Sequence, residues 1–184
     1  MNFIKTFIDG LVVIEPKIFK DNRGYFFESY NEREFLENGI DSRFVQDNQS
    51  KSSYGVVRGL HCQLGEHSQS KLVRVLSGKV LDVAVDVRKD SPTFGKHFAI
   101  ELSDENQLQM FIPKHFLHGF SVLSETATFL YKVDALYCKE SEFGIRYDDA
   151  EIDIDWKIPQ DKIVTSDKDR LSNSLEDLLR HDNQ

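Results

Sequence analysis

Short runs of alternating apolar and polar residues recur along most of this chain, and they constrain its fold more than any other feature. The runs are rich in β-branched residues, and turn signals such as Ser77-Gly78 and Asp90-Ser91-Pro92 separate them. Alternation with period two is typical of half-buried β-strands. Because no long helical pattern lies between the runs, the sequence predicts an antiparallel barrel or sandwich, mainly β. The predicted strands span residues 11–14, 55–60, 71–75, 80–87, 97–102, 108–112, 120–123 and 128–133.

Helical patterns are confined to two short segments. Asn31 and Glu34 have the spacing of a capping box, and Gly39 follows the last apolar residue, so a short helix is expected between them. Residues 172–180 carry leucines at helical spacing, with acidic residues at the start and a basic residue at the end. We therefore expect a C-terminal helical segment at about residues 170–182.

Length, charge and composition exclude several classes of protein. The chain has 184 residues, 40% hydrophobic content and a net charge of −8, which fits a single globular domain over residues 1–184 and disfavours a broad nucleic-acid or anionic-membrane surface. Charged residues interrupt the first 19 residues, so no signal peptide or membrane span is expected there. Two isolated cysteines, Cys62 and Cys138, do not form a disulfide framework. We expect a cytoplasmic protein.

Two segments concentrate chemically useful side chains. Residues 46–63 end in Arg-Gly-Leu-His-Cys-Gln, and residues 113–120 read PKHFLHGF. In a barrel, alternate strand residues point inward, so these groups can share a pocket with Lys71, Tyr131 and Tyr137 from neighbouring strands.

The strand before His61 poses a problem of parity. Arg58 and His61 are an odd number of residues apart, so a regular strand would point them to opposite faces. Gly59 between them indicates a bulge that re-aims one of the two side chains.

A histidine, a lysine and a tyrosine in one pocket suit proton abstraction beside a carbonyl. Such a reaction needs a base near neutral pKa, a cation beside the developing oxyanion and a proton donor. His61, Lys71 and Tyr131 can fill these roles, although each residue type alone is more often structural than catalytic.

A metal site is the competing interpretation. His61 and His67, with His115 and His118, resemble a degraded form of the two metal-binding motifs of cupin barrels. Gln63 stands where the second histidine of the first motif is expected, and a neutral amide is a poor substitute for imidazole on a transition metal. A metal-free site is therefore favoured.

An anionic ligand would need a local basic pocket in this acidic chain. Four basic residues can form one for a diphosphate, although ordinary surface pairing explains them equally well. They are Arg23, Arg58, Lys71 and Lys168.

Long stretches of the chain carry a family resemblance. They are DNRGYFFES (21–29), QDNQSKSSYGVVRGLHCQ (46–63), KLVRVLSGKVLDVAVDVRKDSPTFG (71–95) and IPKHFLHGFSVLSETATFLYK (112–132), followed by Tyr137, Glu142 and residues 154–156 and 166–169. From about Phe19 to Asp169 the chain resembles the dTDP-4-dehydrorhamnose 3,5-epimerase family. The resemblance implies a cupin-type jelly roll, usually a homodimer with its N-terminal portion in the interface. It also implies inversion of dTDP-4-dehydro-6-deoxy-D-glucose at C3 and C5, without a metal or organic cofactor.

The resemblance also implies roles for individual residues. His61 is expected to accept the proton and Asp169 to orient and stabilise its imidazole. Lys71 is expected to stabilise the enolate, and Tyr131 to return a proton from the opposite face of the ring. Residues resembling nucleotide and sugar contacts are Arg23, Glu28, Gln46, Asn48, Arg58, His118, Tyr137, Glu142 and Lys168, of which the first two are expected to act in the site of a partner subunit.

Three positions depart from the usual family pattern and bear on the identity of the sugar nucleotide. Cys62 and Leu136 stand where aromatic residues are common, and Lys114 stands where a glutamate is common. Inversion at only one carbon of a related 4-keto-6-deoxy sugar is the nearest alternative. More distant alternatives are a metal-dependent cupin enzyme using His61, His67 and His118, and a sugar-nucleotide binding module without activity.

Overall fold

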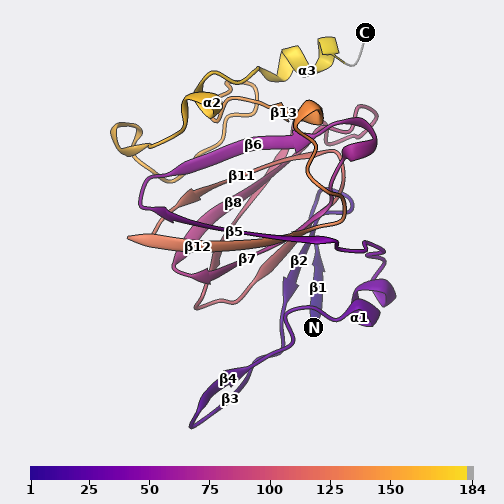
Figure 1. Ribbon diagram of the computed structural model, residues 1–184, viewed down its shortest axis with the longest axis vertical. Helices are drawn as coiled ribbons and strands as arrows, with labels where there is room; N and C mark the ends of the chain where they lie inside the picture. Colours follow the sequence, from indigo (N-terminus) through magenta and orange to yellow (C-terminus); the bar gives the residue numbers. More distant parts are fainter. Residues whose placement is uncertain (182–184) are drawn as a thin grey trace.

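Two antiparallel sheets face each other and form most of the molecule (Figure 1). The computed structural model describes residues 1–181. One sheet has the strand order β1 (Asn2–Lys5), β2 (Val12–Glu15), β10 (Gln109–Ile112), β7 (Lys71–Ser77), β12 (Thr126–Val133) and β5 (Gln46–Ser53). The other has the order β13 (Glu142–Gly144), β6 (Val57–Gln63), β11 (Phe116–Val122), β8 (Lys79–Asp86) and β9 (His97–Ser103). Neighbours such as β7 and β12, or β8 and β11, are distant in sequence, so the sheets make a jelly-roll barrel. The predicted mainly β barrel is confirmed.

The main hydrophobic core lies between the two sheets. Val73 and Phe129 from one sheet pack with Ala84 and Phe120 from the other, and all four are at most 5% exposed. The rings of Phe120 and Phe129 are stacked with centroids 4.4 Å apart. This core fixes the separation of the sheets and hence the width of the barrel.

A second core covers the outer face of the five-stranded sheet. Leu81, Val83 and Val85 of β8 pack there against residues of the C-terminal segment, including Trp156 and Leu178. Because both faces of β8 are covered, all but its first residue are buried, and residues 80–85 are apolar except for Asp82.

The C-terminal segment crosses above β6 and contains two helices, α2 (Asp167–Arg170) and α3 (Leu175–His181) (Figure 1). Of the helical segment expected at 170–182, residue 182 lies outside the described residues. Three short 3₁₀ turns, η1 (Gly65–His67), η2 (Lys139–Ser141) and η3 (Gln160–Lys162), occur in the connections. No helix within residues 1–181 has the length and apolar character needed to cross a membrane.

The N-terminal region extends beyond the barrel. Helix α1 (Glu32–Glu37) begins at Asn31, whose side chain accepts a hydrogen bond from the backbone N–H of Glu34, as the capping pattern predicts. The hairpin of β3 (Phe19–Asp21) and β4 (Gly24–Phe26) projects away from both sheets (Figure 1). Its aromatic side chains are exposed, as Phe26 is by 66%.

Candidate active site

A cavity of about 710 Å³ opens between the two sheets. Strands β5, β7 and β12 supply residues on one side, β6 and β11 supply them on the other, and the segment before and within α2 closes one edge. The polar side chains that line it include Asn48, Arg58, His61, Gln63, Lys71, His118, Tyr131, Tyr137, Glu142, Ser166, Lys168 and Asp169.

A bulge in β6 brings both Arg58 and His61 into this cavity. His118 of β11 is opposite His61, and Phe120 is opposite Arg58, so two steps along β11 match three steps along β6. Only glycine fits at position 59 without strain. The φ of Gly59 is +121°, and a Cβ added there would lie 2.5 Å from the Cα of Gly119. The predicted bulge is present, and it resolves the parity problem.

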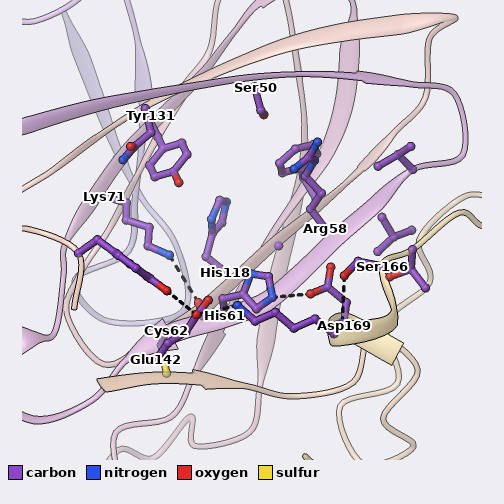
Figure 2. A pocket seen from close by; sticks show the side chains of 18 of the residues that line it. Ser50, Arg58, His61, Cys62, Lys71, His118, Tyr131, Glu142, Ser166 and Asp169 are labelled. Carbon is purple, nitrogen blue, oxygen red and sulfur yellow. Dashed lines mark hydrogen bonds and ion pairs between the residues drawn. The ribbon is translucent and has the colours of Figure 1, made fainter. Parts of the chain in front are cut away.

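His61 is paired with Asp169 of α2. The His61 Nε2 lies 2.7 Å from Asp169 Oδ1, and the His61 side chain keeps 29% of its surface exposed to the cavity. Figure 2 shows the imidazole of His61 between this carboxylate and the cavity. A carboxylate in this position orients the ring and stabilises its protonated form.

Local structure holds Asp169 in place. Ser166 is the N-cap of α2, and its hydroxyl accepts a hydrogen bond from the Asp169 N–H. Burial alone would raise the pKa of the Asp169 carboxyl, but its hydrogen bond with His61 and further bonds from Ser166 and the Gly59 backbone leave the pKa below its usual value. Asp169 is therefore an anion at neutral pH.

A second histidine pair lies deeper in the cavity. His118 Nε2 is 2.8 Å from Asp82 Oδ1, and the carboxylate of Asp82 is fully buried. Burial lowers the pKa of His118; Asp82 opposes this effect, and the neighbouring Lys71 and His61 add to it.

Lys71 of β7 is a buried ammonium group at the wall of the cavity. Its side chain points toward the space beside His118 (Figure 2), and its Nζ is 3.5 Å from the backbone oxygen of His61. Burial lowers the pKa of Lys71, and the neighbouring side chains of Cys62, Asp82 and Glu142 counter that effect. An oxyanion formed beside Nζ would supply the counter-charge that this lysine needs.

Tyr131 faces the same space from β12. Figure 2 shows its hydroxyl directed into the cavity, from the side opposite the His61–Asp169 pair. Burial is the main cause that raises the pKa of Tyr131, so the phenol is protonated at neutral pH and can donate.

Three side chains form a cluster at the mouth of the cavity, which we name the rim cluster: Tyr137, Glu142 and Lys168. Glu142 Oε2 accepts a hydrogen bond from the Tyr137 hydroxyl at 2.8 Å and lies 2.6 Å from Lys168 Nζ. Burial would raise the pKa of Glu142, but these two partners hold the pKa below its usual value. Glu142 therefore stays ionised and ties the cluster together.

Of the other predicted residues, Arg58 and Asn48 line the cavity and Gln46 does not. Arg58 lines it and donates to Ser52 Oγ at 3.0 Å, and Asn48 lines it beside Gln46, whose amide donates to Asn48 at 2.8 Å. Gln46 itself does not line the cavity.

Two further predicted residues lie outside this chain's own cavity, as Gln46 does. Arg23 is on the projecting hairpin, where its side chain is 86% exposed and pairs with Asp21. Glu28 accepts a hydrogen bond from Asn31 on the surface.

The structure also brings in residues that sequence reasoning missed. Asp82 had a visible signal, because it is a carboxylate with apolar residues of β8 on both sides of it. Ser166 had one too, since it stands three residues before Asp169 at the start of a helix. The sequence marks Gln63 only as a poor replacement for a metal ligand.

The residues of the rival metal site do not converge. Within residues 1–181, no group of three or more His, Cys, Asp and Glu side chains could hold a metal ion. His67 is on η1, with its side chain 42% exposed and 3.7 Å from Glu66. The motif that resembles a cupin metal site thus leaves His61 and His118 in separate carboxylate pairs.

The three departures from the family pattern lie in different surroundings. Cys62 is buried in the core under the C-terminal segment and also lines the cavity, and Lys114 pairs with Asp134 at 3.5 Å. Leu136 is 65% exposed beside Tyr137. Two of the three departures therefore lie at the site: Leu136 is exposed beside the rim cluster, and Cys62 is in the wall of the cavity.

Known proteins resemble this chain over nearly its full length. The family model described as dTDP-4-dehydrorhamnose 3,5-epimerase matches residues 5–177. A protein of that name from Methanothermobacter thermautotrophicus is 51% identical over 169 residues, which cover 91% of each chain. The crystal structure of one from Elizabethkingia anophelis has a TM-score of 0.93 and 53% identity, covering 96% of this chain and 97% of the other. A dTDP-6-deoxy-D-glucose-3,5-epimerase from Legionella pneumophila, solved with dTDP-4-keto-L-rhamnose, has a TM-score of 0.91 and 50% identity, covering 95% and 93%.

Proposed function

This chain belongs to the dTDP-4-dehydrorhamnose 3,5-epimerase family, with its cupin-type fold, and we propose how its cavity carries out that reaction. The substrate is dTDP-4-dehydro-6-deoxy-D-glucose, and inversion at C3 and C5 gives dTDP-4-dehydro-L-rhamnose. The observation that carries the proposal is the placement of His61 with Asp169 on one side of a cavity and of the Tyr131 hydroxyl on the other (Figure 2).

Proton removal is assigned to His61. The C–H bonds at C3 and C5 flank the C4 ketone, so their acidity depends on stabilising the enolate. The imidazole takes the proton, and the ionised carboxylate of Asp169, 2.7 Å away, stabilises the imidazolium that forms.

Stabilisation of the enolate is assigned to Lys71. Its buried ammonium group meets little competing solvent, so a negative charge on the C4 oxygen would be strongly favoured beside it. His118, held by Asp82, contributes a fixed polar contact to the sugar.

Reprotonation is assigned to Tyr131. The phenol is kept in its protonated form and reaches the sugar from the face opposite His61. A proton removed on one face and returned on the other inverts the carbon, and a flip of the sugar ring between the two steps allows the same pair to serve both carbons.

Nucleotide binding is assigned to the basic and aromatic groups around the mouth of the cavity. Arg58 and Lys168 provide positive charge for the diphosphate. Tyr137 provides an exposed ring on which a base can stack. Asn48 and Glu142 supply further polar contacts.

The assembly is proposed to be a homodimer of single-domain subunits in the cytoplasm. The hairpin that projects from the barrel exposes Phe19, Tyr25 and Phe26 by more than half, an apolar surface that a second copy would cover. Arg23 and Glu28, which lie outside their own chain's cavity, would then complete the site of the partner.

Proton NMR in deuterated water tests the reaction. The purified protein is incubated with dTDP-4-dehydro-6-deoxy-D-glucose, without added metal, and C3 and C5 are followed. Deuterium at both carbons, with L-rhamno product trapped by a downstream reductase, supports the proposal. Deuterium at only one carbon would assign the chain to the mono-epimerases instead.

A further inference from the structure

Gln63 is a buried amide next to the proposed active site, and no catalytic step uses it. It is two residues after His61 on β6 and is 5% exposed. A buried amide is costly unless its donors and acceptor are bonded, so the partners of this side chain show what it does.

The partners of Gln63 are all backbone groups, and two of them flank Tyr137. The amide nitrogen Nε2 donates to His67 O at 3.0 Å and to Leu136 O at 3.5 Å. The amide oxygen Oε1 accepts from Cys138 N–H at 2.6 Å. Both the donor and the acceptor sides of the amide are therefore engaged by protein.

The contacts around Tyr137 repeat the pattern of a parallel β-ladder. In such a ladder, one residue bonds to the carbonyl before and the N–H after the residue opposite it. The side chain of Gln63 does the same across Tyr137, although residues 134–138 lie outside every strand. It therefore fixes the peptide groups on both sides of Tyr137 and hence the direction of its ring.

Gln63 also positions Glu142, a second member of the rim cluster. The backbone of Gln63 is paired with Glu142 in the β6–β13 ladder, and the Glu142 carboxylate accepts the hydroxyl of Tyr137. One residue thus positions Tyr137 through its side chain and Glu142 through its backbone. The Tyr137 side chain itself is 55% exposed, so packing does little to hold it.

We propose that Gln63 is a positioning residue for nucleotide binding, which holds the Tyr137 ring at the mouth of the cavity so that the base of the nucleotide can stack on it. This inference rests on the proposed function, because it concerns the binding of that same substrate. Gln63 acts through Tyr137 and takes no part in proton transfer.

The test compares substrate binding with turnover in a Gln63→Met variant, which keeps the length of the side chain and removes its hydrogen bonds. Losing the stacking surface should raise the Kd for dTDP and the KM for the dTDP-sugar about tenfold, within the range seen for base–aromatic stacking. We expect kcat to change by less than about threefold, since the proton-transfer groups are untouched. An unchanged KM, or a loss confined to kcat, would overturn the inference.

A double-mutant cycle shows whether Gln63 acts through Tyr137. In a Tyr137→Ala background, Gln63→Met should raise the Kd for dTDP by no more than about twofold, because the ring that Gln63 positions is already gone. If the double variant raised the Kd for dTDP by the full product of the two single-variant effects, the proposal would be contradicted. If Gln63→Met does not fold, as judged by circular dichroism, Gln63→Glu replaces it, since its ionised carboxylate still accepts from Cys138 N–H but no longer donates to Leu136 O.

Asn106→Ala provides the matched control. The amide of Asn106 also brackets a loop, with bonds to Glu101 O, Ser103 N and Leu108 N, and it does not line the cavity. We expect this variant to lose stability without changing KM. The two proposals can fail separately. If the wild-type protein exchanged no deuterium at C3 or C5, the proposed function would be refuted, but the dTDP binding titrations would still test the role of Gln63.

Discussion

Two histidine–carboxylate pairs share one cavity in this protein, yet they differ in exposure and in the origin of the carboxylate. The bonds are alike, since each joins Nε2 to Oδ1, at 2.7 Å for His61–Asp169 and 2.8 Å for His118–Asp82. The side chain of His61 is 29% exposed, whereas that of His118 is 8% exposed. The outer pair therefore presents much more of its imidazole to the cavity than the inner pair does.

The carboxylates show the same contrast. Asp169 comes from helix α2, outside the barrel, and accepts further hydrogen bonds from Ser166 and the Gly59 backbone. Asp82 is on β8, inside the sheet, and among the described residues its Oδ2 has no hydrogen-bond partner. A fully bonded anion can stabilise an imidazolium that forms and disappears in each turnover. A fully buried carboxyl group held within the sheet suits a fixed contact, so we assign the outer pair to proton transfer and the inner pair to positioning.

The largest predicted effect is on His61→Ala. Removing a general base slows its step by about 10²–10⁴-fold, so deuterium exchange at both C3 and C5 should fall by that factor. His118→Ala serves as the comparison, and losing one hydrogen bond to the sugar should cost about tenfold or less. NMR in deuterated water measures both variants. Equal losses would show that the two pairs do not have separate roles.

A Tyr131→Phe variant separates removal of the proton from its return. The ring still fills its place, but it cannot donate, so inversion should fall by about 10²-fold or more. Exchange should persist, within about tenfold of the wild type, because His61 can return a deuteron to the face it came from. Product trapping by a reductase measures inversion, and NMR measures exchange. Loss of exchange in step with inversion would rule out the assignment of opposite faces.

An Asp169→Asn variant tests what the outer carboxylate contributes. A hydrogen bond to a charged group is worth about 1.5–3 kcal/mol, so the rate of exchange should fall by about 10–150-fold. The exchange rate should fall less in Asp169→Asn than in His61→Ala because the base, His61, is still present. Ser166→Ala, which removes the N-cap of α2, should cause a milder fall in the same rate. A wild-type rate in the asparagine variant would remove Asp169 from the mechanism.

The sequence predicted the β class because short runs rich in β-branched residues are separated by turn signals, with no long helical pattern between them. It left barrel and sandwich open, and the jelly roll came from the family resemblance. Strand β5 was missed as a strand because its sequence, QDNQSKSS, has no apolar residue to mark a buried face. The β3–β4 hairpin was missed too, although its turn at residues 21–24 was expected, because it packs on neither sheet.

The candidate site was predictable only in part. The alternation of β6 required a bulge at Gly59, and the structure has one. The partnership of His61 with Asp169 spans 108 residues, so no local pattern could reveal it, and it came from the resemblance. Asp82 was missed because a lone carboxylate in a strand does not say which histidine will face it. The assigned roles remain predictions for the variants above.

The smallest predicted effect concerns the inner pair and the dependence of stability on pH. Burial lowers the pKa of His118 from its usual 6.5, with Lys71 and His61 adding to the effect and Asp82 opposing it. The folded chain therefore binds this proton less readily than the unfolded chain, so the free energy of unfolding should fall as the pH decreases below 6.5. His118→Gln removes that contribution, and its midpoint in urea should shift less than the wild-type midpoint between pH 7.5 and pH 5.5. Asn106→Ala, away from the cavity, should keep the wild-type dependence. If the urea midpoint of His118→Gln depended more steeply on pH than that of the wild type, the fold would stabilise the charged form of His118. The two histidine–carboxylate pairs would then differ only in their exposure.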